Sequence, residues 1–199
     1  MLRDIYAPTD FDSNDQDPSL SPEEKLEIID RFPVTVTPAV LSGRVYDDMC
    51  HVTLPLVRGI TFATGLTSSP TGLFIEHVNV GDKELYGKCI GSRLLRATCH
   101  FAVERDPHID RLSTGWARLG LVNTVVRVLG EENVAVTSGG QRYGWESDRA
   151  LEEVFDDEPA QEGKRYLVYS IEAAIDPEQA MEWEKPVYLL PGAVALPRR

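Results

Sequence analysis

A strand-like segment that passes through a glycine-bearing turn into a helical segment is the feature that most constrains the fold of this chain. Residues 73–80 (LFIEHVNV) are typical of a buried strand, and residues 92–104 repeat apolar side chains at helical spacing. The turn between them, DKELYGKCIG, carries Gly87 and Gly91. Free N–H groups in the first turn of a helix favour a phosphate, and glycine lets such a ligand approach the backbone closely. The sequence therefore predicts an anion site at this turn.

Other strand-like and helical segments lie on both sides of this unit. Before it, β-branched and aromatic residues predict consecutive antiparallel strands at 34–40, 43–57 and 59–67. After it, the pattern predicts a short strand at 112–116, a helix at 118–129 that Gly130 ends, and strands at 132–136 and 164–175, with an acidic helical piece at 147–158. This order predicts a mixed α/β (α+β) fold with a largely antiparallel, twisted central sheet flanked by helices.

The two ends of the chain differ from this middle part. Residues 1–20 are rich in Asp, Pro, Ser and Asn, which predicts an acidic, flexible N-terminal arm. A helix start follows, with Ser21 as the N-cap, Pro22 in the first turn and Glu24 placed to complete a capping box. Residues 176–199 are rich in proline, which predicts an irregular tail or an edge extension. The main domain is expected over residues 21–175.

Charge and composition narrow the range of functions. The 199 residues carry a formal net charge of −12, which repels nucleic-acid backbones and anionic membrane surfaces, so neither is an expected partner. The N-terminus lacks the basic start and apolar run of a secretory signal, which predicts a cytoplasmic protein. The cysteines and histidines show no metal-ligand spacing, so we expect free thiols and no metal. A basic cluster of Lys88, Arg93 and Arg96 can hold a phosphorylated ligand or form a solvated helix face.

Residues 43–175 resemble the GNAT superfamily of acyltransferases. LFIEHVNV is similar to the family's central fourth strand, and YGKCIGSRLL is similar to its turn Arg/Gln-x-x-Gly-x-Gly/Ala. STGW followed by NTVVRVLG resembles the family's fifth strand and fourth helix, and KRYLVYSI resembles its final strand. The chain has Tyr86 and Cys89 at the first and fourth positions of the turn motif. It has Gly130 where the family commonly carries a tyrosine that acts as the general acid.

The resemblance implies a cosubstrate and a set of site residues. Acetyl-CoA or another acyl-CoA would donate the acyl group, and an amine on a small molecule or a protein would accept it. Val78 and Val80 would offer backbone groups to the pantetheine, and Asn123 would belong to the cofactor site. The backbone amides of the turn would hold the CoA pyrophosphate, namely those of Lys88, Cys89, Ile90, Gly91, Ser92 and Arg93.

Aminolysis of a thioester needs positioning, a base for the ammonium proton and donors for the developing oxyanion. Glu76 in the central strand is the candidate base; the competing interpretation is a carboxylate that is paired with an arginine or solvated. Tyr143 in the glycine-rich turn 138–145 is the candidate acid, and it can equally be an aromatic that covers the core. His77 is expected to face away from Glu76, because neighbouring side chains alternate along a strand.

The expected function is a CoA-dependent N-acyltransferase in which the amine attacks the thioester directly within a ternary complex. Two alternatives stay open: a catalytically inactive GNAT-like interaction or structural protein, and a sensor that binds acyl-CoA without turnover. The acidic surface suits a cationic acceptor. A strand edge beside residues 164–171 could pair with a second copy, so a homodimer is also an open interpretation.

Overall fold

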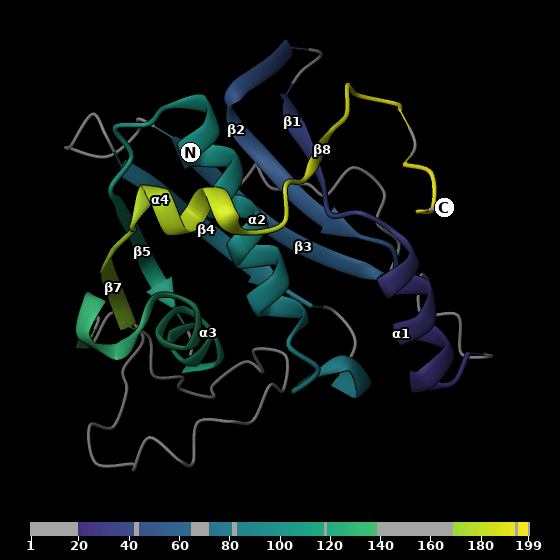
Figure 1. Cartoon of the computed structure of the whole chain (residues 1–199), viewed down its shortest axis with the longest axis horizontal. Helices are drawn as coiled ribbons and strands as arrows, with labels where there is room; N and C mark the ends of the chain where they lie inside the picture. Colours follow the sequence, from purple (N-terminus) through teal and green to yellow (C-terminus); the bar gives the residue numbers. More distant parts are fainter. Residues whose placement is uncertain are drawn as a thin grey trace.

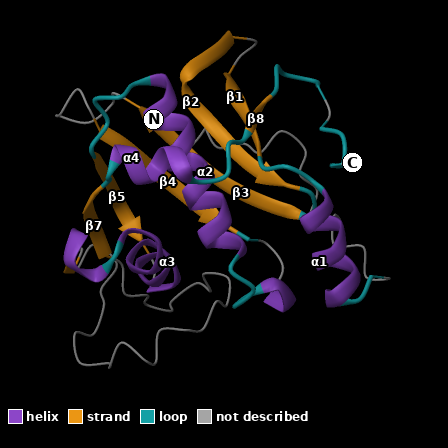
Figure 2. Ribbon diagram, viewed as in Figure 1, coloured by secondary structure: helices purple, strands orange, loops and turns teal. Residues whose placement is uncertain are grey.

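A single open sheet organises the chain, with helices packed against it (Figures 1 and 2). The computed structural model describes residues 20–41, 44–64, 72–80, 83–117, 119–138, 169–193 and 195–198. In this part of the chain the sheet has eight strands in the order β6-β7-β5-β4-β3-β2-β1-β8, and most neighbours are antiparallel. The prediction of a mixed fold with a largely antiparallel sheet flanked by helices is confirmed at this level.

Helix α1 (Pro22–Arg31) begins as the sequence predicts. The Ser21 hydroxyl accepts a hydrogen bond from the Glu24 N–H at 3.3 Å, and the Ser21 N–H donates to the Glu24 carboxylate at 2.8 Å. This reciprocal capping box satisfies two of the N–H groups that a helix start leaves without partners. Ile29, near the C-terminal end of the helix, is buried in the hydrophobic core.

Four antiparallel strands follow in chain order: β1 (Thr35–Leu41), β2 (Arg44–Leu54), β3 (Val57–Thr64) and β4 (Gly72–Asn79). The predicted strand at 43–57 is wrong at its end, because the chain turns at Pro55 and Leu56 and starts β3 at Val57. Proline has no N–H to give to the ladder, which is why the strand ends before it.

A helical crossover then joins β4 to a strand that runs parallel to it. Helix α2 (Ile90–Arg105) links β4 to β5 (Arg111–Ala117), which pairs with β4 in parallel. Helix α3 (Leu119–Leu129) leads to β6 (Val134–Ser138), and β7 (Tyr169–Ala174) inserts between β5 and β6. In Figure 1, α2 and α3 lie on the same side of the sheet. Because β7 is paired on both sides, β6 is the outermost described strand at this end of the sheet.

Helix α2 starts at Ile90, two residues before the predicted start at Ser92. Ser92 lies inside the first turn and is only 5% exposed, so it does not act as the cap. One face of the helix is buried against β2, β3 and β4. Phe101 on this face contacts Phe62 of β3 edge to face, with ring centroids 6.0 Å apart. This burial of apolar side chains, worth about 1.5–3 kcal/mol for each large one, fixes the helix on the sheet.

The C-terminal segment, predicted as an irregular tail or an edge extension, contains two short elements. Helix α4 (Pro177–Glu182) packs against α2, and β8 (Val187–Tyr188) pairs in parallel with β1. The predicted N-terminal arm, apart from Leu20, and the predicted acidic helix at 147–158 lie outside the described residues. No helix in the described part of the chain is long and apolar enough to span a membrane.

Candidate functional site

Strands β4 and β5 separate at the middle of the sheet. Their parallel pairing ends at Ile75 and Thr114, although β4 continues to Asn79 and β5 to Ala117. At the same point β4 carries a bulge on its other edge: Phe62 of β3 pairs with Ile75, and Thr61 pairs with His77, which leaves Glu76 as the extra residue. Beyond Ile75, the backbone of β4 therefore pairs with no described strand on the β5 side.

Two buried oxygens without hydrogen-bond partners lie at this separation. They are Oε2 of Glu76 and Oγ1 of Thr114, and neither has a partner among the residues that the structure describes. Ile75 is in register with Phe62 on one side and with Thr114 on the other, so the three side chains lie on the same face of the sheet. Phe62 contacts Phe101 of α2, so this is the face that α2 covers. A buried polar group without a hydrogen-bond partner costs about 1–3 kcal/mol of stability. Such unpaired groups are expected at a site where a ligand supplies the missing hydrogen bond.

His51 and Thr61 lie on the opposite face, close to Glu76. The two residues are in register on β2 and β3, and His51 Nδ1 is 3.0 Å from Thr61 Oγ1. Burial lowers the pKa of His51 from its ordinary value, and the charge of Glu76 partly opposes this shift. The site thus has Thr114 on one face of the sheet, and Glu76 with the His51 imidazole on the other.

The lowered pKa of His51 predicts an acid-sensitive stability. Below about pH 6.5 the unfolded chain takes up a proton that the folded chain resists, so the free energy of unfolding should fall as the pH falls. His51→Asn can keep the hydrogen bond to Thr61 and should reduce this slope in urea unfolding curves between pH 7.5 and pH 5. His108→Asn, at an exposed position, is the control; an equal slope in wild type and His51→Asn would contradict the prediction.

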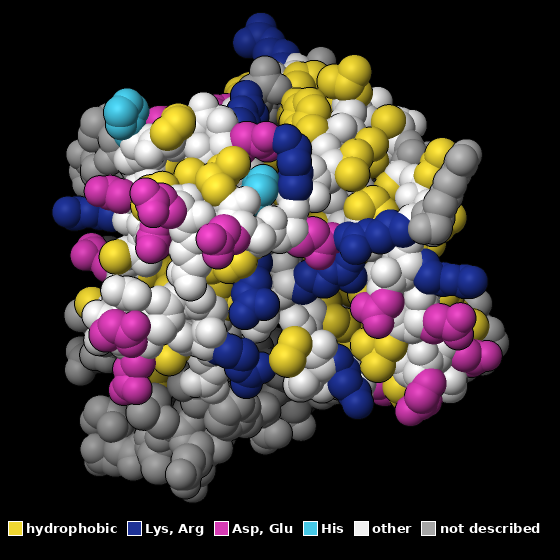
Figure 3. All heavy atoms as spheres, in the orientation of Figure 1, with side chains coloured by type: hydrophobic (Ala, Val, Ile, Leu, Met, Phe, Trp, Pro, Cys, Tyr) yellow, Lys and Arg dark blue, Asp and Glu magenta, His cyan; other side chains and the backbone are white. Residues whose placement is uncertain are grey.

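A cleft of about 640 Å³ lies along the first turns of α2, between α1 and α3. Figure 3 shows Lys and Arg side chains gathered across this part of the surface, with Asp and Glu side chains more numerous toward its margins. Among the described residues, no acidic side chain pairs with Lys88 or Arg96. The cleft is lined by cationic, polar and aromatic side chains, among them Lys88, Cys89, Ser92, Arg96, Arg127 and Trp183.

The start of α2 opens into this cleft. Cys89 is the N-cap, with φ 61° and ψ 13°, and its side chain makes no capping hydrogen bond. The Arg93 N–H donates to the Cys89 carbonyl at 3.0 Å, and the Lys88 N–H donates to the Leu85 carbonyl at 3.3 Å. Of the six amides that the resemblance implies for phosphate, these two are therefore engaged within the chain. The N–H groups of residues 89–92 have no acceptor inside the helix, as the geometry of a helix start requires.

Cys89 occupies the left-handed backbone region, where a side chain is unfavourable by roughly 1–2 kcal/mol. Cys89→Gly should remove this strain and raise the free energy of unfolding by about 0.5–1 kcal/mol after the extra entropy of an unfolded glycine. Gly87→Ala is the matched control, because Gly87 has φ 75° with no atom near an added Cβ, and it should be destabilising. Urea unfolding measures both. A destabilised Cys89→Gly would contradict the assignment of strain.

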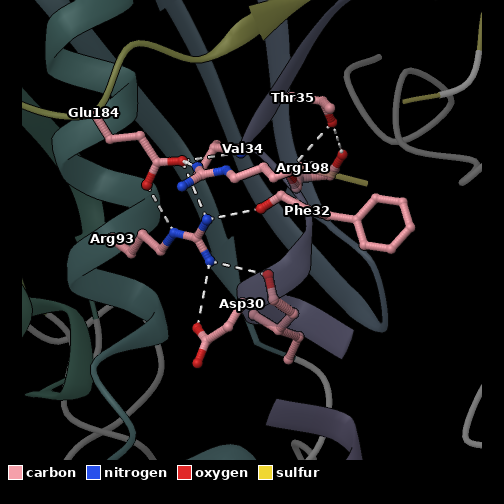
Figure 4. Close-up of polar contacts among 9 residues, drawn as sticks. Asp30, Phe32, Val34, Thr35, Arg93, Glu184 and Arg198 are labelled. Atoms are coloured by element: carbon pink, nitrogen blue, oxygen red, sulfur yellow. Dashed lines mark hydrogen bonds and ion pairs between the residues drawn. The ribbon is translucent and has the colours of Figure 1, made fainter. Parts of the chain in front are cut away.

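The Arg93 guanidinium joins three parts of the chain instead of facing open space (Figure 4). It donates to both carboxylate oxygens of Glu184, at 2.8 and 3.1 Å. It also donates to the backbone carbonyls of Ile29 at 3.1 Å and Phe32 at 2.8 Å, where α1 ends. Arg198 pairs with the same carboxylate. The predicted basic cluster is thus divided: Arg93 fixes α1 and the C-terminal segment to α2, while Lys88 and Arg96 line the cleft.

The other predicted site residues lie in several environments. Val78 and Val80 pack partly buried against the core at the separated end of β4, and Ile90 is buried within it. Gly91 approaches α3 closely, since an added Cβ would lie 3.5 Å from the Thr124 hydroxyl. Asn123 is exposed on α3. Tyr143 and the side chain of His77 lie outside what the structure describes.

Sequence reasoning missed His51, Thr114, Arg127 and Trp183. Arg127 reaches the cleft from α3, where its Nη1 lies 3.7 Å from Cys89 Sγ. No local motif marks these residues, because strand pairing and helix packing bring them to the site. Within the described residues, no group of three His, Cys, Asp or Glu side chains could hold a metal. The sequence matches no protein-family model, and no curated protein matches it closely enough to indicate a relationship.

Proposed function

We propose that this chain is a CoA-dependent N-acyltransferase of the GNAT type, with acetyl-CoA or another acyl-CoA as donor and an amine as acceptor. The observation that carries the proposal is the separation of β4 and β5 at Ile75 and Thr114, flanked by two buried oxygens without partners. This separation leaves the backbone of β4 near Val78 and Val80 open on the β5 side, where the resemblance implies contacts with the pantetheine. It lies beside the start of α2, where an anion site is expected.

The donor fits the helix-covered side. The backbone of β4 beyond Ile75 offers N–H and C=O groups that an extended pantetheine can pair with, as a peptide pairs with an open strand edge. The free N–H groups of residues 89–92 would bind the pyrophosphate, with Lys88 and Arg127 supplying positive charge. Thr114 Oγ1 would then donate a hydrogen bond to the bound cofactor near its thioester.

The acceptor fits the opposite side, where Glu76 lies. Its carboxylate would bind the ammonium group and take the proton that the amine must lose before it attacks. The C–N bond then forms and the C–S bond breaks, and the CoA thiolate takes, directly or through water, the proton that the attacking nitrogen loses as it becomes an amide. Because donor and acceptor approach from the two faces and meet at the gap, the reaction needs no covalent enzyme intermediate.

A sensor that binds acyl-CoA without turnover is a second candidate, which Cys89 favours. A cysteine in the left-handed region at the phosphate turn places a Cβ where the family has glycine. Gly130 also leaves the family's usual tyrosine acid without a counterpart at that position. Binding without turnover would distinguish this candidate from the enzyme.

The test is calorimetric titration of acetyl-CoA and desulfo-CoA into the full chain, followed by a thiol-release assay with a panel of amines. Saturable micromolar binding, with a matching rise in thermal stability, is expected. Release of CoA only in the presence of an amine supports the acyltransferase. Binding without release supports the sensor. No binding at millimolar ligand overturns both and leaves the catalytically inactive interaction protein.

A further inference from the structure

We propose that the cleft between α1, α2 and Trp183 is a nucleotide subsite, in which a purine ring stacks on Trp183 and its phosphates extend along α2 toward Cys89. The cleft would bind the adenosine end of CoA, so this inference rests on the proposed function. Two of its walls, α1 and the segment at 183–184, nevertheless lie outside the region that carries the resemblance.

Charge is the first argument. The chain carries a formal charge of −12, yet Lys88, Arg96 and Arg127 all line this cleft. The two carboxylates that also line it, Asp30 and Glu184, both face the Arg93 guanidinium, at 3.8 and 2.8 Å. In the described part of the chain no carboxylate neutralises Lys88 or Arg96. A local excess of positive charge on an acidic protein indicates an anionic ligand.

Shape and polarity are the second argument. Leu26 and Trp183 are partly buried against the core and also line the cleft, so they form an apolar wall beside the cations. A flat aromatic next to positive charge suits a nucleobase that carries phosphates, whereas inorganic phosphate would leave this wall exposed to water. The volume of about 640 Å³ falls within the range of ordinary small-ligand sites.

Length is the third argument. From Cys89 to Arg96 the helix rises about 10 Å, at about 1.5 Å per residue. This length matches a diphosphate, a ribose and a base in extended form, with the diphosphate at the free N–H groups of residues 89–92 and the base near Trp183. Arg96, one turn beyond Arg93, is then placed to reach a phosphate on the ribose.

The test uses the full chain with four probes: CoA, adenosine 3′,5′-bisphosphate, pantetheine and inorganic pyrophosphate. Dissociation constants are measured by calorimetry for wild type, Trp183→Leu, Trp183→Phe, Arg96→Ala and Arg111→Ala. Phenylalanine keeps an aromatic face, and Arg111 is an exposed arginine on β5 that controls for the loss of one positive charge. Thermal melting checks that each variant is folded, and Arg96→Ala keeps the test decisive if Trp183→Leu is not folded.

We expect adenosine 3′,5′-bisphosphate to bind wild type more tightly than pyrophosphate. Trp183→Leu should weaken binding of CoA and of the bisphosphate about tenfold and leave pantetheine unchanged, since stacking on an aromatic is lost. Arg96→Ala should weaken the two nucleotides by a similar factor, whereas Arg111→Ala and Trp183→Phe should change binding less than threefold.

Two results would overturn the inference. One is equal binding of pyrophosphate and bisphosphate, and the other is nucleotide binding that neither Trp183→Leu nor Arg96→Ala weakens, or that Arg96→Ala does not weaken if Trp183→Leu is not folded. Failure of the subsite and failure of the proposed function can be distinguished. CoA binding and turnover without sensitivity at Trp183 would remove the subsite and keep the enzyme. Bisphosphate binding that depends on Trp183, without acyl transfer to any amine, would keep the subsite and remove the enzyme.

Discussion

Glu76→Gln is expected to lower kcat for acyl transfer about 10²–10⁴-fold, the usual contribution of a positioned base. Glutamine fills the same space but cannot take the ammonium proton from the acceptor. Binding of acetyl-CoA should stay within about twofold of wild type, because Glu76 lies on the face opposite the expected donor. Steady-state kinetics and calorimetry on the same preparations measure the two effects separately.

The same substitution should not reduce stability. Oε2 of Glu76 is buried without a partner among the described residues, and an uncharged amide is less costly to bury than a carboxylate in that state. Groups that serve catalysis commonly cost folding energy in this way. Glu172→Gln, an exposed carboxylate on β7, is the matched control and should keep full activity. Wild-type turnover by Glu76→Gln would exclude this carboxylate as the base.

Arg93→Ala is expected to lower the free energy of unfolding by about 2–4 kcal/mol. The substitution removes hydrogen bonds to two backbone carbonyls at the end of α1 and leaves Glu184 without its main partner. The Arg93 side chain is 21% exposed, so water can replace only part of these contacts. Urea unfolding followed by circular dichroism measures the loss.

Arg31→Ala provides the comparison for this variant. The Arg31 side chain is 69% exposed and its ion pair with Glu27 is 4.0 Å long, so its loss should cost less than about 0.5 kcal/mol. Equal effects of the two substitutions would show that Arg93 does not join α1 and the C-terminal segment to α2. A nucleotide affinity that fell together with stability in Arg93→Ala would indicate that the α1 wall of the cleft had moved.

The contact between Arg93 and Glu184 should also make the free energy of unfolding depend on pH. Burial tends to raise the pKa of Glu184, but the hydrogen bond and charge of Arg93, with smaller help from the Val34 N–H and Arg198, hold it below its ordinary value. A lowered folded-state pKa adds stability at neutral pH that is lost as the pH falls through that pKa. Arg93→Ala should therefore lose less stability than wild type between pH 6 and pH 3.

Local patterns were sufficient to predict most elements of the fold. The capping box at Ser21 and Glu24, the antiparallel strands before β4 and the strand–turn–helix unit are all present. These features depend on residues within a few positions of one another, so periodicity and capping chemistry are enough. The helical segment was expected from residue 92, two residues after the observed start, because the apolar repeat does not show that the preceding turn places Cys89 at the N-cap.

The site depended more on long-range structure. The sequence identified Glu76 and the turn at residues 88–92, since a carboxylate in an apolar strand and glycines before a helix are local signals. Local residue patterns did not indicate that the pairing of β4 with β5 ends at Ile75, because that depends on a bulge opposite β3 and on the length of pairing with β5. His51 is brought near Glu76 only by the register of β2 and β3.

The sequence by itself therefore determined the order of the strands and helices from α1 to β7 that the structure describes, the acidic charge and the turn at the start of α2. Tertiary structure alone decided which cations are available, since Lys88, Arg93 and Arg96 are equivalent in the sequence. Packing places α1 and Glu184 against Arg93, and their carbonyl and carboxylate oxygens satisfy its guanidinium. Lys88 and Arg96 meet no such acceptors among the described residues, so they remain in the cleft beside Trp183.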